Sequence, residues 1–264
     1  MRRRNSREKS SGEFNLAVST WNYLCAYSYD AKLAAAIREI VEDNFGVELW
    51  IGWVAEPALF DESRWPDLRD MLGDTRLSVH TGLGSFDEAL LRKEVDMAAS
   101  LGAETLVAHD GTLGLKLQEE SEKLECCRNA VNYAISKGVR VVLENGTRSV
   151  LENALAHVAD LEICLDIGHA NIAEGGIEAF LDRLGTVIGH VHLADNYGQT
   201  DDHLVPGDGY ISMEDWRGLF RTLRNAKFAG DLVLELNTPD PKRDAKRSRE
   251  FIKYVLRSIE DDVR

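Results

Sequence analysis

The sequence predicts a single (β/α)8 barrel, an α/β fold, on three observations. The chain has 264 residues, and one such barrel commonly takes about 250. Eight short apolar segments alternate with amphipathic stretches that have helical spacing. Neither a linker nor a low-complexity insertion interrupts this series. We expect strands at Asn15–Ser19, Val47–Ile51, Leu77–Thr81, Thr105–His109, Arg140–Glu144, Ile163–Asp166, Val187–Leu193 and Leu232–Leu236.

The stretches between these strands have the apolar spacing of helices that bury one face. We expect helices at Asp30–Asn44, Asp87–Leu101, Gln118–Lys137, Ser149–Val158, Ile177–Leu184, Met213–Asn225 and Asp244–Ile259. Gly102 and Gly138 follow two of them, where glycine ends a helix well. A doubly wound sheet is the alternative, although it rarely needs eight such even units. Residues 13–264 therefore form one predicted catalytic domain, after a disordered basic tail at residues 1–12.

Composition excludes some functions and disfavours others. The net charge of −14 makes nucleic acid an unexpected partner, since basic groups carry that affinity. The sequence has no apolar run of 18 residues, which excludes a transmembrane span. It also has no glycine-rich fingerprint or Walker loop, so a nucleotide cofactor is not expected. The four cysteines have no CxxC spacing, which favours a reducing, cytoplasmic location.

Histidine and acidic residues gather at the carboxyl ends of the predicted strands. Six of the seven histidines lie at or just after a strand end, and only His157 falls in a predicted helix, as a surface residue. In a (β/α)8 barrel these ends meet at one mouth, where catalytic groups lie. The residues at these ends are His80, His109, Glu144, Asn145, Asp166, His169, His190, His192, Asp195, Asp201, His203 and Glu235.

So many carboxylates at one mouth, with few basic residues nearby, predict a divalent cation. Buried charge without a partner is costly, and a cation relieves that cost. Histidine with aspartate and glutamate is a ligand mix suited to Zn²⁺, Mn²⁺, Fe²⁺ or Co²⁺. For Glu48 a structural ion pair and support of a ligand are equally open. We expect His190 to lie inside the barrel. We expect Asp195 to hold a ligand histidine in place.

The chain resembles the xylose isomerase-like TIM barrel superfamily over nearly its whole length after the tail. This superfamily holds sugar isomerases and epimerases and also the endonuclease IV type of abasic-site endonuclease. The resemblance rests on an ordered set of motifs: Val47-Glu-Leu, Leu143-Glu-Asn, Leu165-Asp-Ile-Gly-His169, His190-Val-His-Leu-Ala-Asp195, Asp201-Asp-His-Leu-Val-Pro-Gly-Asp-Gly209 and Leu234-Glu-Leu.

The resemblance implies metal ligands at specific positions. The shared metal site falls on Glu144, Asp166, His192 and Glu235. The endonuclease branch adds two metals, whose ligands match His80, His109 and Glu144 for one and His169, Asp201 and His203 for the other. We therefore expect one to three divalent ions per chain, of Zn²⁺, Mn²⁺, Mg²⁺ or Co²⁺. The ligand set alone does not decide between the branches.

The favoured function is a metal-dependent isomerase or epimerase acting on a sugar, sugar phosphate or related polyol. Its chemistry removes a proton beside a carbonyl through a metal-stabilised enediolate, and the resemblance assigns the two proton carriers to Glu144 and Glu235. The alternative is an endonuclease IV-like phosphodiesterase with three metals. The short segment between His80 and Phe86 leaves little room for a loop that penetrates a DNA duplex.

Aromatic and amide side chains near the mouth are candidates for binding the substrate. Trp21 follows the first strand and Trp53 the second, and aromatic faces stack on sugars; packing of the loops over the barrel is an equally open reading. Asn145 either contacts the substrate or orients Glu144. We expect a small sugar or polyol as the partner and possible association into homo-oligomers, with no membrane partner.

Overall fold

The computed structural model describes residues 14–27, 33–52, 61–82 and 84–261. The predicted tail at residues 1–12 and Trp53 lie outside these ranges. The described part contains eight strands: β1 (Asn15–Ser19), β2 (Gly46–Trp50), β3 (Leu77–His80), β4 (Thr105–Ala108), β5 (Arg140–Glu144), β6 (Glu162–Asp166), β7 (Ile188–Leu193) and β8 (Asp231–Leu234).

The helices of the described residues follow the strands in turn. They are α1 (Trp21–Tyr27), α2 (Leu33–Glu42), α3 (Trp65–Leu72, after the short 3₁₀ helix η3 at Glu62–Arg64), α4 (Glu88–Leu101), α5 (Glu120–Ser136), α6 (Arg148–His157), α7 (Ile167–Ile172), α8 (Gly176–Leu184), α9 (Met213–Asn225) and α10 (Pro241–Asp261).

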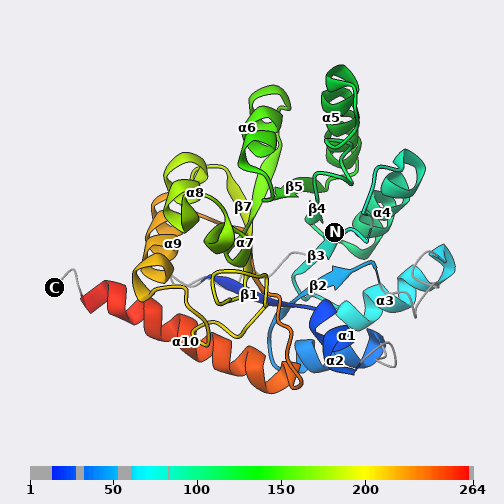
Figure 1. Cartoon of the computed structure of the whole chain (residues 1–264). Coiled ribbons are helices and arrows are strands. Elements are labelled where there is room, and N and C mark those ends of the chain that lie inside the picture. The colour runs from blue at the N-terminus through cyan, green and yellow to red at the C-terminus, as the bar shows by residue number, and fades with distance from the viewer. Residues whose placement is uncertain (1–13, 28–32, 53–60, 83, 262–264) are drawn as a thin grey trace.

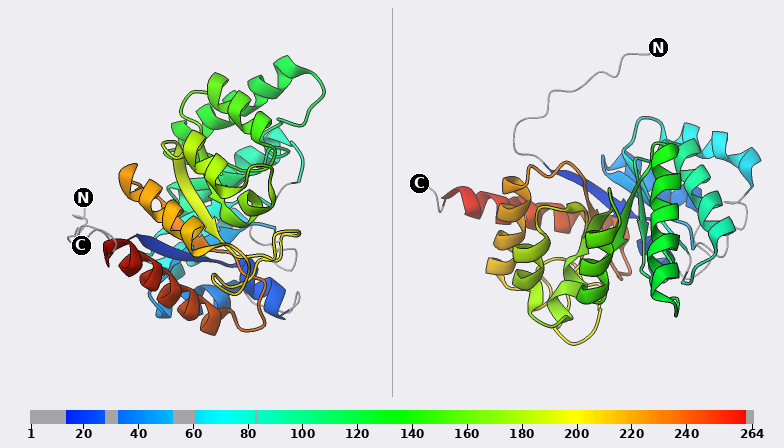
Figure 2. Two further views of the ribbon diagram at one scale, coloured as in Figure 1. Left: turned by 60° about the vertical axis from the view of Figure 1, so that its left-hand side comes forward. Right: turned by 90° about the horizontal axis from the view of Figure 1, so that it is seen from above.

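The strands close into one parallel barrel in chain order, with β8 paired to β1. Figure 1 shows the helices forming a ring around these strands, and Figure 2 shows α10 running beside α9 on the outside. The predicted (β/α)8 barrel is therefore confirmed, and the doubly wound sheet is not observed. None of the helices in the described ranges is both long and apolar enough to cross a membrane.

Side-chain alternation along the strands divides the core into two parts. Residues of one parity, such as Leu143 and Leu165, belong to the large apolar cluster under the helices. Residues of the other parity point into the barrel, because successive side chains on a strand face opposite ways. Val107, Val142 and Cys164 form a separate small cluster there. The remaining interior positions are largely polar and lead up to the barrel mouth.

The predicted strands are confirmed within two residues at each end, and β1 and β5 match at both ends. Three helical segments, α1, α3 and α7, were not among those expected, because each is short and two lie directly at the barrel mouth. The two helix ends predicted from glycine are confirmed as well. Gly102 is the left-handed cap of α4 with φ 83°, and Gly138, with φ 79°, lies just past the end of α5.

We predict that Gly230→Ala weakens the barrel where β8 begins. A Cβ at Gly230 would lie 2.0 Å from the carbonyl oxygen of Gly189, so backbone must move. Such overpacking costs about 2–3 kcal/mol of unfolding free energy, which urea unfolding measures. Gly84→Ala is the control, because its Cβ meets nothing within 4 Å among the described residues. Equal urea midpoints for Gly230→Ala and the wild type would contradict the close approach.

Candidate metal centre at the barrel mouth

Three buried carboxylates lie around one imidazole nitrogen at the barrel mouth. Nδ1 of His192 lies 3.6 Å from Oε1 of Glu144, 3.8 Å from Oδ2 of Asp166 and 3.3 Å from Oε2 of Glu235. Strand register produces part of this closeness, since Asp166 on β6 is paired with His192 on β7. All four residues are at most 7% exposed. We call Glu144, Asp166, His192 and Glu235 the four-residue group.

The four-residue group fits a divalent cation. Ligand atoms bound to one ion at 2.0–2.2 Å are separated by about 3.0–3.5 Å, close to the spacings found here. Asp166 Oδ2 and His192 Nδ1 are also buried without a hydrogen-bond partner, and buried polar atoms are normally satisfied. A cation between the carboxylates would give both atoms a partner.

Local structure aims the Asp166 carboxylate at the centre of this group. Oδ1 caps helix α7 by accepting the N–H of His169 at 2.8 Å, which leaves Oδ2 for the group. Asn145, a predicted substrate contact, joins the ends of β5 and β6 instead. Its amide oxygen accepts the N–H of Asp166 at 2.5 Å, and its amide nitrogen donates to the Asp166 carbonyl at 3.1 Å. A substrate contact by Asn145 stays a prediction.

The structure also brings together His80, His109 and Glu144. Glu144 Oε2 lies 3.1 Å from Nε2 of His80 and 3.6 Å from Nδ1 of His109. His80 Nδ1 lies 2.8 Å from the carbonyl oxygen of Thr81. Because a carbonyl accepts only from N–H, this contact holds the proton on Nδ1 in the neutral ring and leaves Nε2 to face Glu144.

Asp201 joins the two remaining predicted ligands. Its Oδ2 lies 2.9 Å from Nε2 of His169 and 2.8 Å from Nε2 of His203. His203 Nδ1 donates to the carbonyl oxygen of Glu235 at 3.0 Å, which directs Nε2 toward Asp201. His169 Nδ1 lies 3.4 Å from Oε1 of Glu144, so Glu144 contacts members of all three predicted ligand sets.

The loop after β7 is organised from within by Asp195. The Asp195 carboxylate accepts the N–H groups of Asn196, Gly207 and Ile211 at 2.8, 2.9 and 3.1 Å. These contacts fix the loop that carries Asp201 and His203. A direct contact of Asp195 with a ligand histidine stays a prediction.

Trp21 lies beside the predicted ligands, whereas two further aromatic side chains, those of Tyr23 and Trp65, are buried. The Trp21 and His203 rings are 4.7 Å apart between centroids. Tyr23, also on α1, and Trp65, on α3, are buried in the apolar core. His157 is exposed on α6, as expected of a surface residue.

The buried carboxylates raise the proton affinity of the imidazoles around them. Burial alone would lower the pKa of His80, but the hydrogen bond and charge of Glu144 raise it to about 9. Burial likewise opposes the charged form of His169, yet Asp166 and Asp201 raise its pKa to about 10. Burial favours neutral Glu144, but the nearby histidines lower its pKa well below the ordinary value. Protons therefore supply the compensating positive charge when no cation is bound.

Sequence reasoning missed one buried acid near the mouth. Glu94 on α4 is 1% exposed and accepts the N–H of Gly82 at 3.4 Å. Burial raises the pKa of Glu94 to about 7. The signal was present, since Leu91, Glu94, Val95 and Ala98 have the spacing of one buried helical face.

Fold and site together define a closed parallel barrel whose acidic and imidazole side chains converge at the carboxyl ends of its strands. The model of the xylose isomerase-like TIM barrel family matches residues 29–255, and the chain belongs to this family.

Comparisons with individual proteins agree with this assignment. Fructoselysine 3-epimerase of Shigella flexneri is 26% identical over 203 residues, which is 70% of each chain. An uncharacterised protein of Methanocaldococcus jannaschii is 31% identical over 192 residues. The matched region spans 51%, 63% and 54% of the length of three uncharacterised relatives.

Solved structures share the fold. A D-tagatose 3-epimerase-like protein superposes with a TM-score of 0.73 at 24% identity, covering 95% of this chain and all of that one. An L-ribulose 3-epimerase gives 0.72 at 16% identity, covering 95% and 97%.

We predict that Zn²⁺ affinity rises with pH between 6 and 8. Burial lowers the pKa of His192, a member of the four-residue group, but neighbouring acidic groups raise it well above the ordinary value, so a metal bound there must displace a proton at neutral pH. Affinity should gain up to ~10-fold per pH unit for each proton released. Competition with a chromophoric chelator at pH 6, 7 and 8 measures this, with surface variant His157→Gln as control. An affinity that stays constant over this range would contradict the protonated state of this imidazole.

Proposed function

We propose that the protein is a divalent-metal-dependent isomerase or epimerase acting on a sugar, sugar phosphate or related polyol. The observation that carries the proposal is the four-residue group, in which two glutamates from separate parts of the barrel share the mouth with an unpartnered imidazole nitrogen. Family membership and the likeness to fructoselysine 3-epimerase support the same chemistry.

The metal ligands in this proposal are Glu144, Asp166, His192 and Glu235. Zn²⁺, Mn²⁺, Mg²⁺ or Co²⁺ are the candidate ions, one to three per chain. A cation bound there supplies charge stabilisation for oxygen atoms of the substrate that become negative. The donor set, three carboxylate oxygens and one imidazole nitrogen, suits such ions.

Proton transfer is assigned to Glu144 and Glu235. Glu144 ends β5 and Glu235 follows β8, so the two carboxylates approach the mouth from well-separated strands. One takes the proton beside the carbonyl, and the other returns a proton on the opposite face, which inverts that carbon in an epimerase. Burial favours the neutral form of both glutamates, but nearby imidazoles lower the pKa of each, so either one can act as the base at neutral pH. The glutamate on the opposite face must then carry the proton that it returns, and the two exchange protonation states in each turnover.

Substrate binding is assigned to the mouth beside α1. Trp21 presents its ring next to His203, where an aromatic face can pack on the apolar face of a sugar. Trp53 and Asn145 complete the proposed substrate contacts.

Endonuclease activity stays as the second candidate function because Glu144 contacts members of all three ligand sets. Charge opposes it. Basic residues that follow the strands pair with acidic side chains: Lys116 with Asp110, Arg148 with Glu152, Lys242 with Glu42 and Arg243 with Asp244. Phosphate backbones need basic groups that are available for contact.

We predict that Glu144→Gln and Glu235→Gln each lower turnover by about 10²–10⁴-fold, since an amide cannot accept the proton. Exchange of substrate hydrogen with solvent deuterium, followed by NMR over a ketose and polyol panel with Mn²⁺ or Co²⁺, measures this. Glu152→Gln on the outer helix α6 is the matched control. A near-wild-type rate in either variant at the mouth would remove that residue from proton transfer.

A nicking assay separates the two candidate functions. We expect no cleavage of a duplex with one abasic site, using protein shown to contain bound Zn²⁺ or Mn²⁺. Efficient cleavage that is lost on chelation would replace the epimerase proposal with the endonuclease reading.

A further inference from the structure

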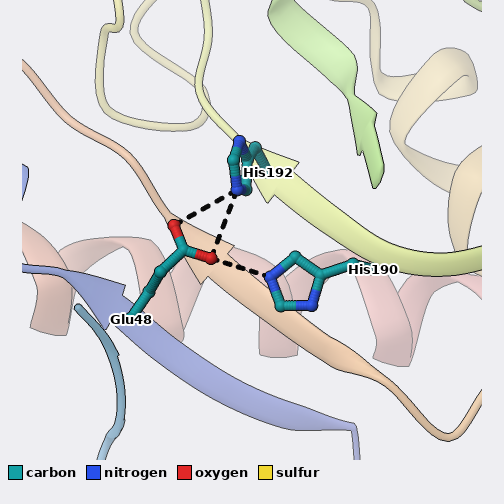
Figure 3. A group of neighbouring side chains, drawn as sticks. All are labelled: Glu48, His190 and His192. Carbon is teal, nitrogen blue, oxygen red and sulfur yellow. Dashed lines mark hydrogen bonds and ion pairs between the residues drawn. The ribbon is translucent and has the colours of Figure 1, made fainter. Parts of the chain in front are cut away.

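Glu48 lies wholly inside the barrel, below the four-residue group, and makes contacts across the interior. It is on β2, and its side chain is 0% exposed, as are those of His190 and His192 on β7. Oε2 of Glu48 lies 2.9 Å from Nε2 of His190 and accepts the hydroxyl of Ser78 at 3.1 Å. Figure 3 shows the carboxylate between the two imidazoles.

The contact with His192 differs from the one with His190, because His192 faces two partners. Its Nε2 lies 3.2 Å from Oε1 and 3.4 Å from Oε2 of Glu48. Its other nitrogen, Nδ1, faces the three carboxylates of Glu144, Asp166 and Glu235 and has no hydrogen-bond partner. The imidazole thus stands between a buried carboxylate below and the candidate metal position above.

We propose that Glu48 is a positioning residue that holds the proton of His192 on Nε2 and fixes the ring, so that the Nδ1 lone pair faces the metal position. This inference rests on the metal site proposed above and names a residue outside its ligand set.

The contact between Glu48 and Nε2 of His192 determines which nitrogen of His192 carries the lone pair. A neutral imidazole has one N–H and one lone pair, and the partner of one nitrogen decides which nitrogen keeps the proton. A carboxylate can only accept, so it selects the tautomer with hydrogen on Nε2. A carboxylate behind a histidine ligand also makes that ligand a stronger donor to the metal.

The neighbours of Glu48 keep its carboxylate in place. His190 and Ser78 both contact Oε2, and Ser78 is the residue paired with Glu48 across β2 and β3. The contact from β7 to β2 spans the interior of the barrel, because β8 and β1 lie between those strands. His190 on β7 and Ser78 on β3 therefore hold the Glu48 carboxylate in place independently of its contact with His192.

Glu48→Gln tests the tautomer directly. An amide keeps the size of the side chain but has one oxygen, so in either orientation its NH₂ faces the Nε2 of one of the two histidines. With the oxygen kept for His190 and Ser78, the NH₂ replaces Oε1 at 3.2 Å from Nε2 of His192, and the oxygen at 3.4 Å is the only acceptor of Glu48 left to that nitrogen. The preference for the proton on Nε2 is thereby weakened, and a proton on Nδ1 blocks the metal ligand. We expect Co²⁺ to bind about 10–100-fold more weakly, with a changed visible spectrum.

Glu94→Gln is the matched control. It makes the same change at a second buried glutamate, whose carboxylate accepts the backbone N–H of Gly82. We expect its Co²⁺ affinity within twofold of wild type and an unchanged spectrum. A lower melting temperature of metal-free Glu48→Gln, with wild-type affinity and spectrum, would show a structural role only and overturn the inference.

Glu48→Asp keeps the test decisive if the glutamine variant does not fold. It retains the buried charge but withdraws the carboxylate by one methylene from His192, so Co²⁺ affinity should fall at least threefold. Wild-type affinity in this variant would overturn the inference. Failure of the wild-type protein itself to bind Co²⁺ would instead overturn the metal-dependent function, and the inference with it.

Discussion

Buried negative charge is the constraint on which the rest of the site depends. Three carboxylates lie within 3.8 Å of one imidazole nitrogen, and a further carboxylate, that of Glu48, lies behind the ring. Ionised groups removed from water require compensating charge and hydrogen bonds. The surrounding histidines, the capped helix α7 and the backbone groups that orient His80 and His203 all satisfy this requirement. The polarity of the barrel interior is thus a consequence of the charge at its mouth.

The sequence was sufficient for the architecture because strand alternation and helix spacing are local signals. It also placed the candidate ligands, since the topology of a parallel barrel brings strand ends together wherever their exact limits fall. Three-dimensional contacts decided the rest. Asn145 is predicted to contact the substrate or to orient Glu144, and Asp195 to hold a ligand histidine; the structure shows contacts of both side chains with backbone groups, of Asp166 and of the loop after β7. Such side-chain-to-backbone pairing has no pattern along the chain.

The two candidate chemistries share their ligands, and this explains why residue identity alone does not separate them. Glu144 contacts His80, His109, His169 and His192. Its carboxylate is therefore part of the site whether one metal ion or three are bound. What differs between a sugar enzyme and a DNA enzyme is the surface around the mouth: its charge, its aromatic faces and the length of its loops. The ion-paired lysine and arginine side chains and the ring of Trp21 belong to that surface.

The loop held by Asp195 has a consequence for the thermodynamics of binding. The loop is fixed by hydrogen bonds within the chain, including a reciprocal backbone pair between Asp195 and Leu204 at 2.8 Å. Ordering a segment during binding costs conformational entropy and weakens affinity. Because Asp201 and His203 are carried by a loop that already has these bonds, ligand capture there needs little ordering. The free energy gained when a ligand contacts Asp201 and His203 therefore contributes to affinity, because little of it is needed to order the loop.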